Sequence, residues 1–198
     1  LKIIENDAFG PVALNRPPPV SSLAPELSVY LTTFTKCTVS GLRAGYMAAP
    51  PALLPALTAR TIVFGWMATP LMCELATRWV EDGTALQLAQ WQRAALAGRH
   101  RILCEELVGF DWSGGPAALH IWLRLPAGWT ADGFVAQARH LNISVAPERP
   151  FLTPKAAPQN AVRISTGSVQ DSDQFHAAVR MIAELLRKPS EVYQQLSY

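Results

Sequence analysis

The chain has 198 residues with a formal net charge of +2 at pH 7, and 49% of its residues are hydrophobic, so it can bury a substantial core in one or two domains. This charge is too small to favour nucleic-acid binding by the segment, and no apolar run reaches the roughly 18 residues that a membrane-spanning helix needs. The three cysteines, Cys37, Cys73 and Cys104, have no paired spacing. This favours free thiols in a reducing cytoplasm over a framework of disulfide bonds.

Three strands are predicted in the N-terminal part. The apolar run Leu1–Ile4 is consistent with a buried parallel strand, and Glu5–Asp7 end it at the polar edge where ligands bind in open α/β sheets. The run Val29–Phe34 is rich in β-branched and aromatic residues and predicts a second strand, and a third extended run starts at Gly45. Between the first two, the prolines of Asn15–Val20 exclude both a helix and ladder bonding.

Helices are predicted in the middle of the chain. Thr69 is a predicted N-cap with Pro70 at the first helical position, and Gly83 is a predicted helix end. A helix capped by Thr84 would run to about Val108, and at about 1.5 Å per residue its length would be about 37 Å. The predicted helices are Ala52–Val63, Leu71–Asp82 and Thr84–Val108, and on the last of these Leu88, Trp91, Ala95 and Ile102 are predicted to share one face.

The C-terminal part predicts an α+β unit in which helices cover one face of a sheet. Ala118–Leu125 alternates apolar and polar residues, which is typical of a half-buried strand. Further predicted elements are the strands Ile143–Ala146 and Ala161–Ser165, the helix Thr130–Leu141 with Thr130 as its N-cap, and the helix Asp173–Arg187 capped by Asp171 or Ser172.

A chemically distinctive stretch, VYLTTFTKCTVSGLRAGY, surrounds Lys36. Lysine forms a Schiff base with an aldehyde, and an arginine with hydroxyl groups can bind a phosphate. Lys36 and Arg43, with the neighbouring threonines, therefore suit a phosphorylated aldehyde cofactor, and we expect both side chains to point into one pocket. Because Thr33 and Lys36 are an odd number of residues apart, the strand must twist or end between them.

TTFTKCTVSGLRAGY resembles the lysine region of fold-type I pyridoxal-phosphate enzymes, the aminotransferase class I/II superfamily. The segments IIENDAFGP, RPPPVSSLAPE, WVEDGTALQLAQWQRAALAGRHRIL and AVRIS follow the same order as in that family. The resemblance is closest to MocR-type regulators of the GntR family and covers the second half of their aminotransferase-like domain. It implies an α/β fold in which residues 1–92 form the C-terminal part of the cofactor-binding large domain and residues 93–198 form a small α+β domain. The start at Leu1, inside a strand, is interpreted as that of a fragment.

The resemblance also implies roles for individual residues. Lys36 would bind pyridoxal 5'-phosphate as a Schiff base and act as a general base. Arg43 and Thr33 would bind its phosphate, with Thr35 as a weaker candidate. Arg163 would hold the α-carboxylate of the substrate through a bidentate contact. The alternative to these binding roles is a structural one: Thr33 and Thr35 would be ordinary strand residues, and Arg163 would be a surface arginine on an edge strand.

Asn6 and Phe9 depart from the family pattern. Many relatives have an aspartate at the first position, which keeps the pyridine nitrogen protonated, and a tyrosine at the second, which bonds the phenolic oxygen of the cofactor. Asn6 supplies no charge and Phe9 no hydrogen bond, so the electron sink for transamination is weakened while cofactor binding is retained. Asp7 takes the place of Asn6 if the strand register differs by one residue.

Two functions compete on this basis. The first is a fragment of a regulator's effector domain that binds an amino compound through Lys36, forms a homodimer and contacts DNA only through a domain absent from this chain. The second is a stand-alone aminotransferase acting on an α-amino acid. A third interpretation, without either function, is a scaffold that has lost the cofactor. No metal site is predicted, because His100 and Cys104 lie one helical turn apart without a third ligand.

Overall fold

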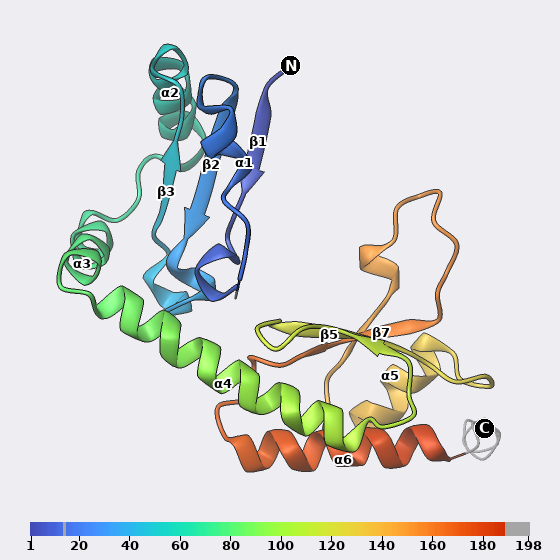
Figure 1. The fold of residues 1–198 in the computed structure, drawn as a ribbon. Coiled ribbons are helices and arrows are strands. Elements are labelled where there is room, and N and C mark those ends of the chain that lie inside the picture. Colours follow the sequence, from blue (N-terminus) through green and yellow to red (C-terminus); the bar gives the residue numbers. More distant parts are fainter. Residues whose placement is uncertain (14, 189–198) are drawn as a thin grey trace. The chain divides into compact units, whose positions relative to one another are not determined.

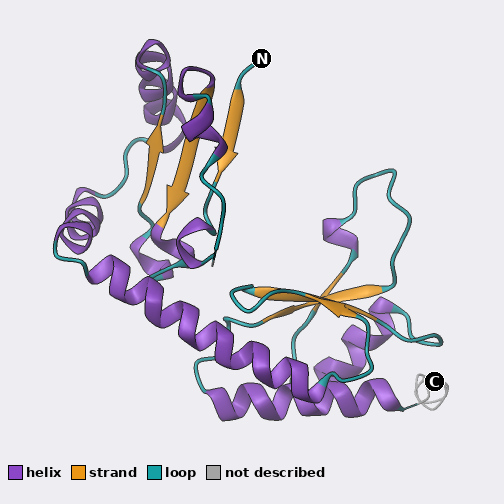
Figure 2. Cartoon of the chain, in the orientation of Figure 1, coloured by secondary structure: helices purple, strands orange, loops and turns teal. Residues whose placement is uncertain are grey.

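The computed structural model describes residues 1–13 and 15–188. The chain forms two compact units, Leu1–Ala94 and Ala95–Tyr198, and each has its own sheet with accompanying helices (Figures 1 and 2). This mixture of helices and strands is the α/β architecture that the sequence predicts. Within the described residues, no helix combines the length and the apolar character needed to cross a membrane.

The first unit contains a three-stranded sheet with the order β1-β2-β3. Strand β1 (Ile3–Asn6) is parallel to β2 (Ser28–Thr33), and β3 (Gly45–Ala48) is antiparallel to β2 (Figure 1). The three predicted strands are confirmed, but the first one lies two residues later than predicted because pairing to β2 begins at Ile3. It is also not buried, since Ile4 is 73% exposed.

Strand β2 ends at Thr33, one residue earlier than predicted, and the chain continues as a 3-10 helix, Phe34–Lys36. This is the interruption that the odd spacing between Thr33 and Lys36 requires. A second 3-10 helix, Ser40–Leu42, lies between Lys36 and β3. Phe34 and Leu42 are buried together with Ala44 and Ala76, so apolar packing holds the turn after β2 in place.

Among the described residues of the first unit, four α-helices start, at residues 20, 54, 70 and 84. The three predicted helices are confirmed to within two residues at each end, and the short α1 was not predicted. At the start of the long helix the side-chain acceptor is Asp82, whose Oδ1 accepts the Thr84 N–H at 2.8 Å, so the predicted Thr84 cap is wrong. The helices are α1 (Val20–Leu23), α2 (Leu54–Gly65), α3 (Pro70–Glu81) and α4 (Thr84–Glu106).

The most buried residues of α4 differ from the predicted ones, although Ile102 of the predicted face packs against the core of the second unit. The residues of α4 that are buried are Ala89, Leu96 and Leu103, whereas Trp91 from the predicted apolar face is 67% exposed. The physical reason is that tertiary partners select the face: Ala89 packs with Val12 and Cys37 of the first unit. Leu103 joins the core of the second unit.

The second unit contains a four-stranded sheet with the order β4-β5-β7-β6. The predicted strand Ala161–Ser165 is confirmed residue for residue. The predicted strand Ile143–Ala146 is wrong in its bounds, because the residues of this segment that pair with β7 are Ala146 and Pro147. A further two-residue strand, at Trp112–Ser113, was not predicted. The strands are β4 (Trp112–Ser113), β5 (His120–Arg124), β6 (Ala146–Pro147) and β7 (Ala161–Ser165).

Helices α5 (Ala131–His140) and α6 (Ser172–Arg187) cover one face of this sheet, as predicted (Figure 1). Ile121 and Leu123 of β5 belong to the same buried core as residues of both helices. Thr130 caps α5, and Asp171 caps α6 by accepting two backbone N–H groups. Because side chains alternate along a strand, Trp122 and its cross-strand partner Arg163 lie on the opposite face.

Candidate functional site

Lys36 is exposed at the end of its 3-10 helix and lies beside Phe9. The Nζ atom is 5.9 Å from the centroid of the Phe9 ring, within the range of a cation–π contact. Two residues that are 27 positions apart in the sequence are thus brought together by the parallel pairing of β1 and β2. The lysine and the position where relatives carry a tyrosine lie at one end of the sheet.

Thr33 and Thr35 form a hydrogen-bonded network at the same place. The Thr33 hydroxyl donates to the Ala44 carbonyl at 3.0 Å and accepts the Thr35 N–H at 3.2 Å. Its oxygen also lies 2.9 Å from the Thr35 hydroxyl. Since the Thr33 proton is engaged with Ala44, Thr35 is the donor in that contact. A phosphate bound by these threonines would therefore replace hydrogen bonds that already order the turn.

Arg43 ends the 3-10 helix that follows Lys36. It adopts a left-handed backbone conformation with φ +50°, which orients the chain into β3. Its side chain is exposed, and within the described residues the guanidinium makes no hydrogen bond or ion pair. The residue is therefore available to an anion, and the pocket that it shares with Lys36 stays a prediction.

Asn6 and Asp7 lie on opposite faces of the sheet. Asn6 pairs with Leu31 in β2, so alternation places it on the face of Thr33. The Asp7 carboxylate instead contacts Tyr30, whose hydroxyl donates to Oδ2 at 2.6 Å, and forms an ion pair with Arg16. We therefore keep Asn6 as the candidate partner of a pyridine nitrogen and assign Asp7 a structural role.

The cluster of Asp7, Arg16 and Tyr30 was not predicted from the sequence. Burial raises the pKa of the Asp7 carboxyl, but the hydrogen bonds from Arg16 and Tyr30 outweigh burial and hold that pKa below its ordinary value. Burial and the contact with Asp7 raise the pKa of the Tyr30 hydroxyl. A Cβ atom at Gly10 would collide with both members of the ion pair, so the pair requires glycine there.

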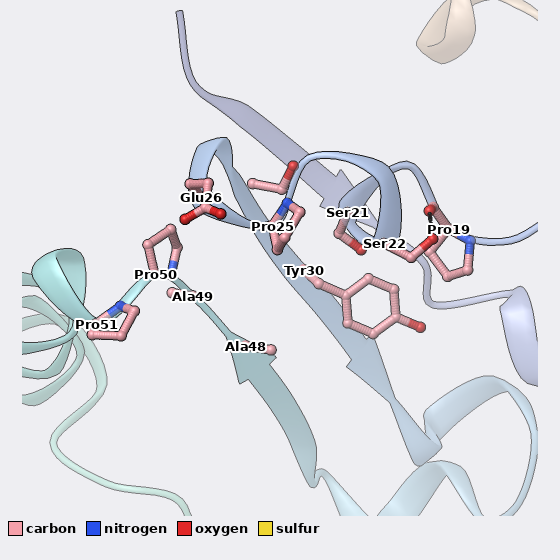
Figure 3. A pocket seen from close by; sticks show the side chains of 11 residues that line it. Pro19, Ser21, Ser22, Pro25, Glu26, Tyr30, Ala48, Ala49, Pro50 and Pro51 are labelled. Carbon is pink, nitrogen blue, oxygen red and sulfur yellow. Dashed lines mark hydrogen bonds between the residues drawn. The ribbon is translucent and has the colours of Figure 1, made fainter.

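A cavity of about 540 Å³ opens on the Tyr30 face of the sheet. Figure 3 shows the Tyr30 ring between the α1 segment and the end of β3. Prolines and serines dominate the wall, including Pro19, Ser21, Pro25 and Pro50. Because Asn6 and Thr33 belong to the other face, this cavity is separate from those two predicted cofactor residues.

Arg163 lies in the second unit, on the face of the sheet that α5 and α6 do not cover. Its Cζ atom is 4.6 Å from the centroid of the Phe151 ring, and its buried Nε has no hydrogen-bond partner among the described residues. The ring of Trp122 meets the ring of Phe151 edge to face, with centroids 5.8 Å apart. The carboxylate site at Arg163 stays a prediction. Phe151 was not recognised in the sequence because only the tertiary fold brings it to Arg163.

His100 and Cys104 contact each other, with Nδ1 and Sγ 3.5 Å apart. The other ring nitrogen, Nε2, lies 3.3 Å from the Gly114 carbonyl. In residues 1–13 and 15–188, no group of three metal-ligating side chains comes together. In this part of the chain, His100 and Cys104 are therefore not joined by a third metal-ligating side chain.

Comparisons with known proteins show what the chain is similar to. The family model described as aminotransferase class I and II matches residues 5–182. The chain is 22% identical over 186 residues to the uncharacterised HTH-type transcriptional regulator YdeF of Bacillus subtilis, covering 94% of this chain and 40% of that protein. It is 24% identical over 198 residues to the 2-aminoadipate transaminase of Thermus thermophilus, covering 94% of this chain and 49% of the transaminase.

A solved structure shows the same fold. The α-aminoadipate aminotransferase LysN of Thermus thermophilus, complexed with N-(5'-phosphopyridoxyl)-L-leucine, matches with a TM-score of 0.81 and 22% identity. The match covers 99% of this chain and 51% of LysN. The chain therefore spans about half the length of the relatives that it matches.

Proposed function

Because the chain belongs to the aminotransferase class I and II family, whose cofactor is pyridoxal 5'-phosphate, we propose that it is the aminotransferase-like effector part of a MocR-type transcriptional regulator. In this proposal Lys36 carries the cofactor and an amino compound is the effector. The supporting observation is the gathering of Lys36, Phe9, Asn6 and Thr33 at the C-terminal ends of two parallel strands. Ligands of open α/β sheets bind at this edge.

The residues at this edge fit the cofactor chemically. The Lys36 amine is exposed and can attach to the aldehyde, while Arg43 and the hydroxyls of Thr33 and Thr35 would bind the phosphate. When bound, the cofactor supplies a ring that withdraws electrons from the bonds of an attached amine. Lys36, once displaced by that amine, would take up or return a proton at its Nζ atom.

Arg163 would bind the carboxylate of an amino-acid effector. Its place on the face of the sheet that α5 and α6 do not cover supports this role, as does its Nε, which has no hydrogen-bond partner among the described residues. A guanidinium fits a carboxylate with two parallel hydrogen bonds, which a lysine cannot do. The effector class that this predicts is an α-amino acid or a close analogue.

A regulator is favoured over an enzyme by two residues. Asn6 cannot hold a positive charge on the pyridine nitrogen as a carboxylate does, and the Phe9 ring beside Lys36 cannot donate a hydrogen bond. Both changes weaken the electron withdrawal that transamination needs. The match to YdeF supports the same choice. A stand-alone aminotransferase, supported by the match to 2-aminoadipate transaminase, is the second candidate.

The proposal includes a homodimer. Within the described chain, α2 and the residues after it contain exposed apolar side chains, with Phe64 84% and Trp66 72% exposed. Exposed apolar groups of this kind mark interaction surfaces. DNA would be contacted through a domain outside these residues.

Borohydride reduction tests cofactor attachment. The full-length protein is incubated with pyridoxal phosphate, reduced, digested and mapped by mass spectrometry. We expect one phosphopyridoxyl group on Lys36 and none at that site in a Lys36→Ala variant. An unlabelled Lys36 would overturn both the regulator and the enzyme. A winged-helix domain encoded upstream of Leu1 would support the regulator, whereas a start codon shortly before an aminotransferase half would support the enzyme.

A further inference from the structure

The guanidinium of Arg163 lies against the Phe151 ring, and that ring contacts Trp122. Phe151 comes from a 3-10 helix, Arg149–Phe151, and its ring lies over the Arg163 Cζ atom at 4.6 Å. The Trp122 ring meets that of Phe151 at an interplanar angle of 86°. Trp122 is the direct cross-strand partner of Arg163 in β5, so strand register and an aromatic contact together locate the guanidinium.

We propose that Phe151 is a positioning residue that orients the Arg163 guanidinium for a planar carboxylate. This inference rests on the proposed carboxylate-binding role of Arg163. The centroid of the Phe151 ring lies 4.6 Å from the Arg163 Cζ atom, and in this proposal the ligand binds the N–H groups at the edge of the guanidinium. A carboxylate approaching that edge can accept two hydrogen bonds at once.

The surroundings explain why such positioning matters. Arg163 is half-buried and, among the residues that the structure describes, forms no ion pair. Its other cross-strand partner, Ala146, is small and cannot hold the long side chain. Without Phe151, the arginine would regain rotamer freedom that a ligand must then remove at a cost in binding free energy.

The loop that carries Phe151 is itself anchored. The buried Glu148 carboxylate accepts the Gln159 N–H at 2.7 Å and the Asn160 N–H at 3.1 Å. Both ends of the loop are thereby held at the start of β7, next to Arg163. Glu148 is consequently engaged by backbone groups and does not neutralise the guanidinium.

Side-chain NMR of the 198-residue chain tests the inference without cofactor or turnover. The Nε–H signal of Arg163 and the indole N–H signal of Trp122 are followed during titration with propionate, and with propionamide as the uncharged probe of the same shape. The variants are Phe151→Leu, which keeps an apolar side chain but removes the ring, and Phe151→Tyr, which keeps the ring. Arg163→Gln assigns the signal.

We expect propionate, and not propionamide, to shift the Arg163 signal. Loss of a cation–π contact should weaken propionate binding about threefold to fivefold in Phe151→Leu, while Phe151→Tyr should bind as the unmodified chain does. Equal affinity in Phe151→Leu would overturn the role of Phe151 alone. Absence of propionate binding in the unmodified chain would overturn the role of Arg163 and this inference with it, but would leave attachment of the cofactor at Lys36 unaffected.

Discussion

The Nζ atom of Lys36 lies 5.9 Å from the centre of the Phe9 ring. In the resembled family a tyrosine hydroxyl stands at the Phe9 position and bonds the cofactor. Here the same place presents an aromatic face to the lysine. The ring supplies no hydrogen-bond donor to a bound aldehyde.

Phe9→Tyr is therefore expected to strengthen cofactor binding. The new hydroxyl would add one hydrogen bond to a charged group, which contributes about 1.5–3 kcal/mol, so the dissociation constant of pyridoxal phosphate should fall at least about tenfold. An absorbance titration measures this constant. Phe9→Leu is the control that removes the ring without adding a donor. Equal affinity in Phe9→Tyr and the unmodified protein would argue against a cofactor next to this ring.

Asp7→Asn is expected to destabilise the first unit in a pH-dependent way. The folded-state pKa of Asp7 lies below its ordinary value, so its stabilisation is complete above the unfolded-state pKa of about 3.9 and is lost as the pH falls through the folded-state pKa. Because Arg16 is one-third exposed, we expect a loss of only about 1 kcal/mol at neutral pH.

Urea unfolding at several pH values measures this difference for Asp7→Asn. The gap between variant and unmodified chain should close in acid, because protonated Asp7 resembles asparagine. Tyr30→Phe is the matched control, since it removes the 2.6 Å hydrogen bond but keeps the ion pair and hence most of the pH dependence. A gap that stays constant down to acid pH would contradict the assigned role.

Glu148→Gln is expected to loosen the loop before β7. The carboxylate, 7% exposed, accepts two backbone N–H groups with its two oxygens, and an amide has only one acceptor oxygen. Leaving one N–H unpaired costs about 1–3 kcal/mol. Hydrogen exchange of the Gln159 and Asn160 amides should therefore accelerate at least about fivefold.

The neighbouring Asp132→Asn variant is the control for that measurement. Asp132 pairs with Arg149 at 3.8 Å, but both side chains are more than three-quarters exposed, so this pair contributes little. Exchange at Gln159 and Asn160 should be unchanged in Asp132→Asn. Similar acceleration in both variants would indicate a general effect of charge instead of the buried acceptor.

Cys37 is expected to resist thiol reagents in the folded chain. It is 4% exposed, and burial raises the pKa of its thiol, so the reactive thiolate is scarce and inaccessible. Cys104, which is exposed, should react first with iodoacetamide, as followed by mass spectrometry of the digested chain. All three cysteines should react after denaturation. Modification of Cys37 as fast as Cys104 under native conditions would show that the contact of Cys37 with Val12 and Ala89 opens readily.

The local sequence determined those strands and helix caps whose stabilising interactions lie between residues close together in the chain. The caps of α5 and α6 depend on side chains at their own first turns, Thr130 and Asp171, and the strand at Ala161 depends on its own apolar run. The resemblance of the stretch around Lys36 to the aminotransferase family was likewise visible in the sequence without knowledge of the fold. These features could be predicted because the interactions that cause them are between near neighbours.

Tertiary structure decided which faces and partners these elements use. The buried side of α4 is set by Val12 and Cys37, which pack on Ala89, although the helical spacing allowed another face. Strand register turned Asp7 towards Tyr30 and away from Asn6. Phe151 reaches Arg163 only through loop closure and strand pairing. Contacts between segments distant in sequence depend on packing and register, and no local pattern encodes either of these.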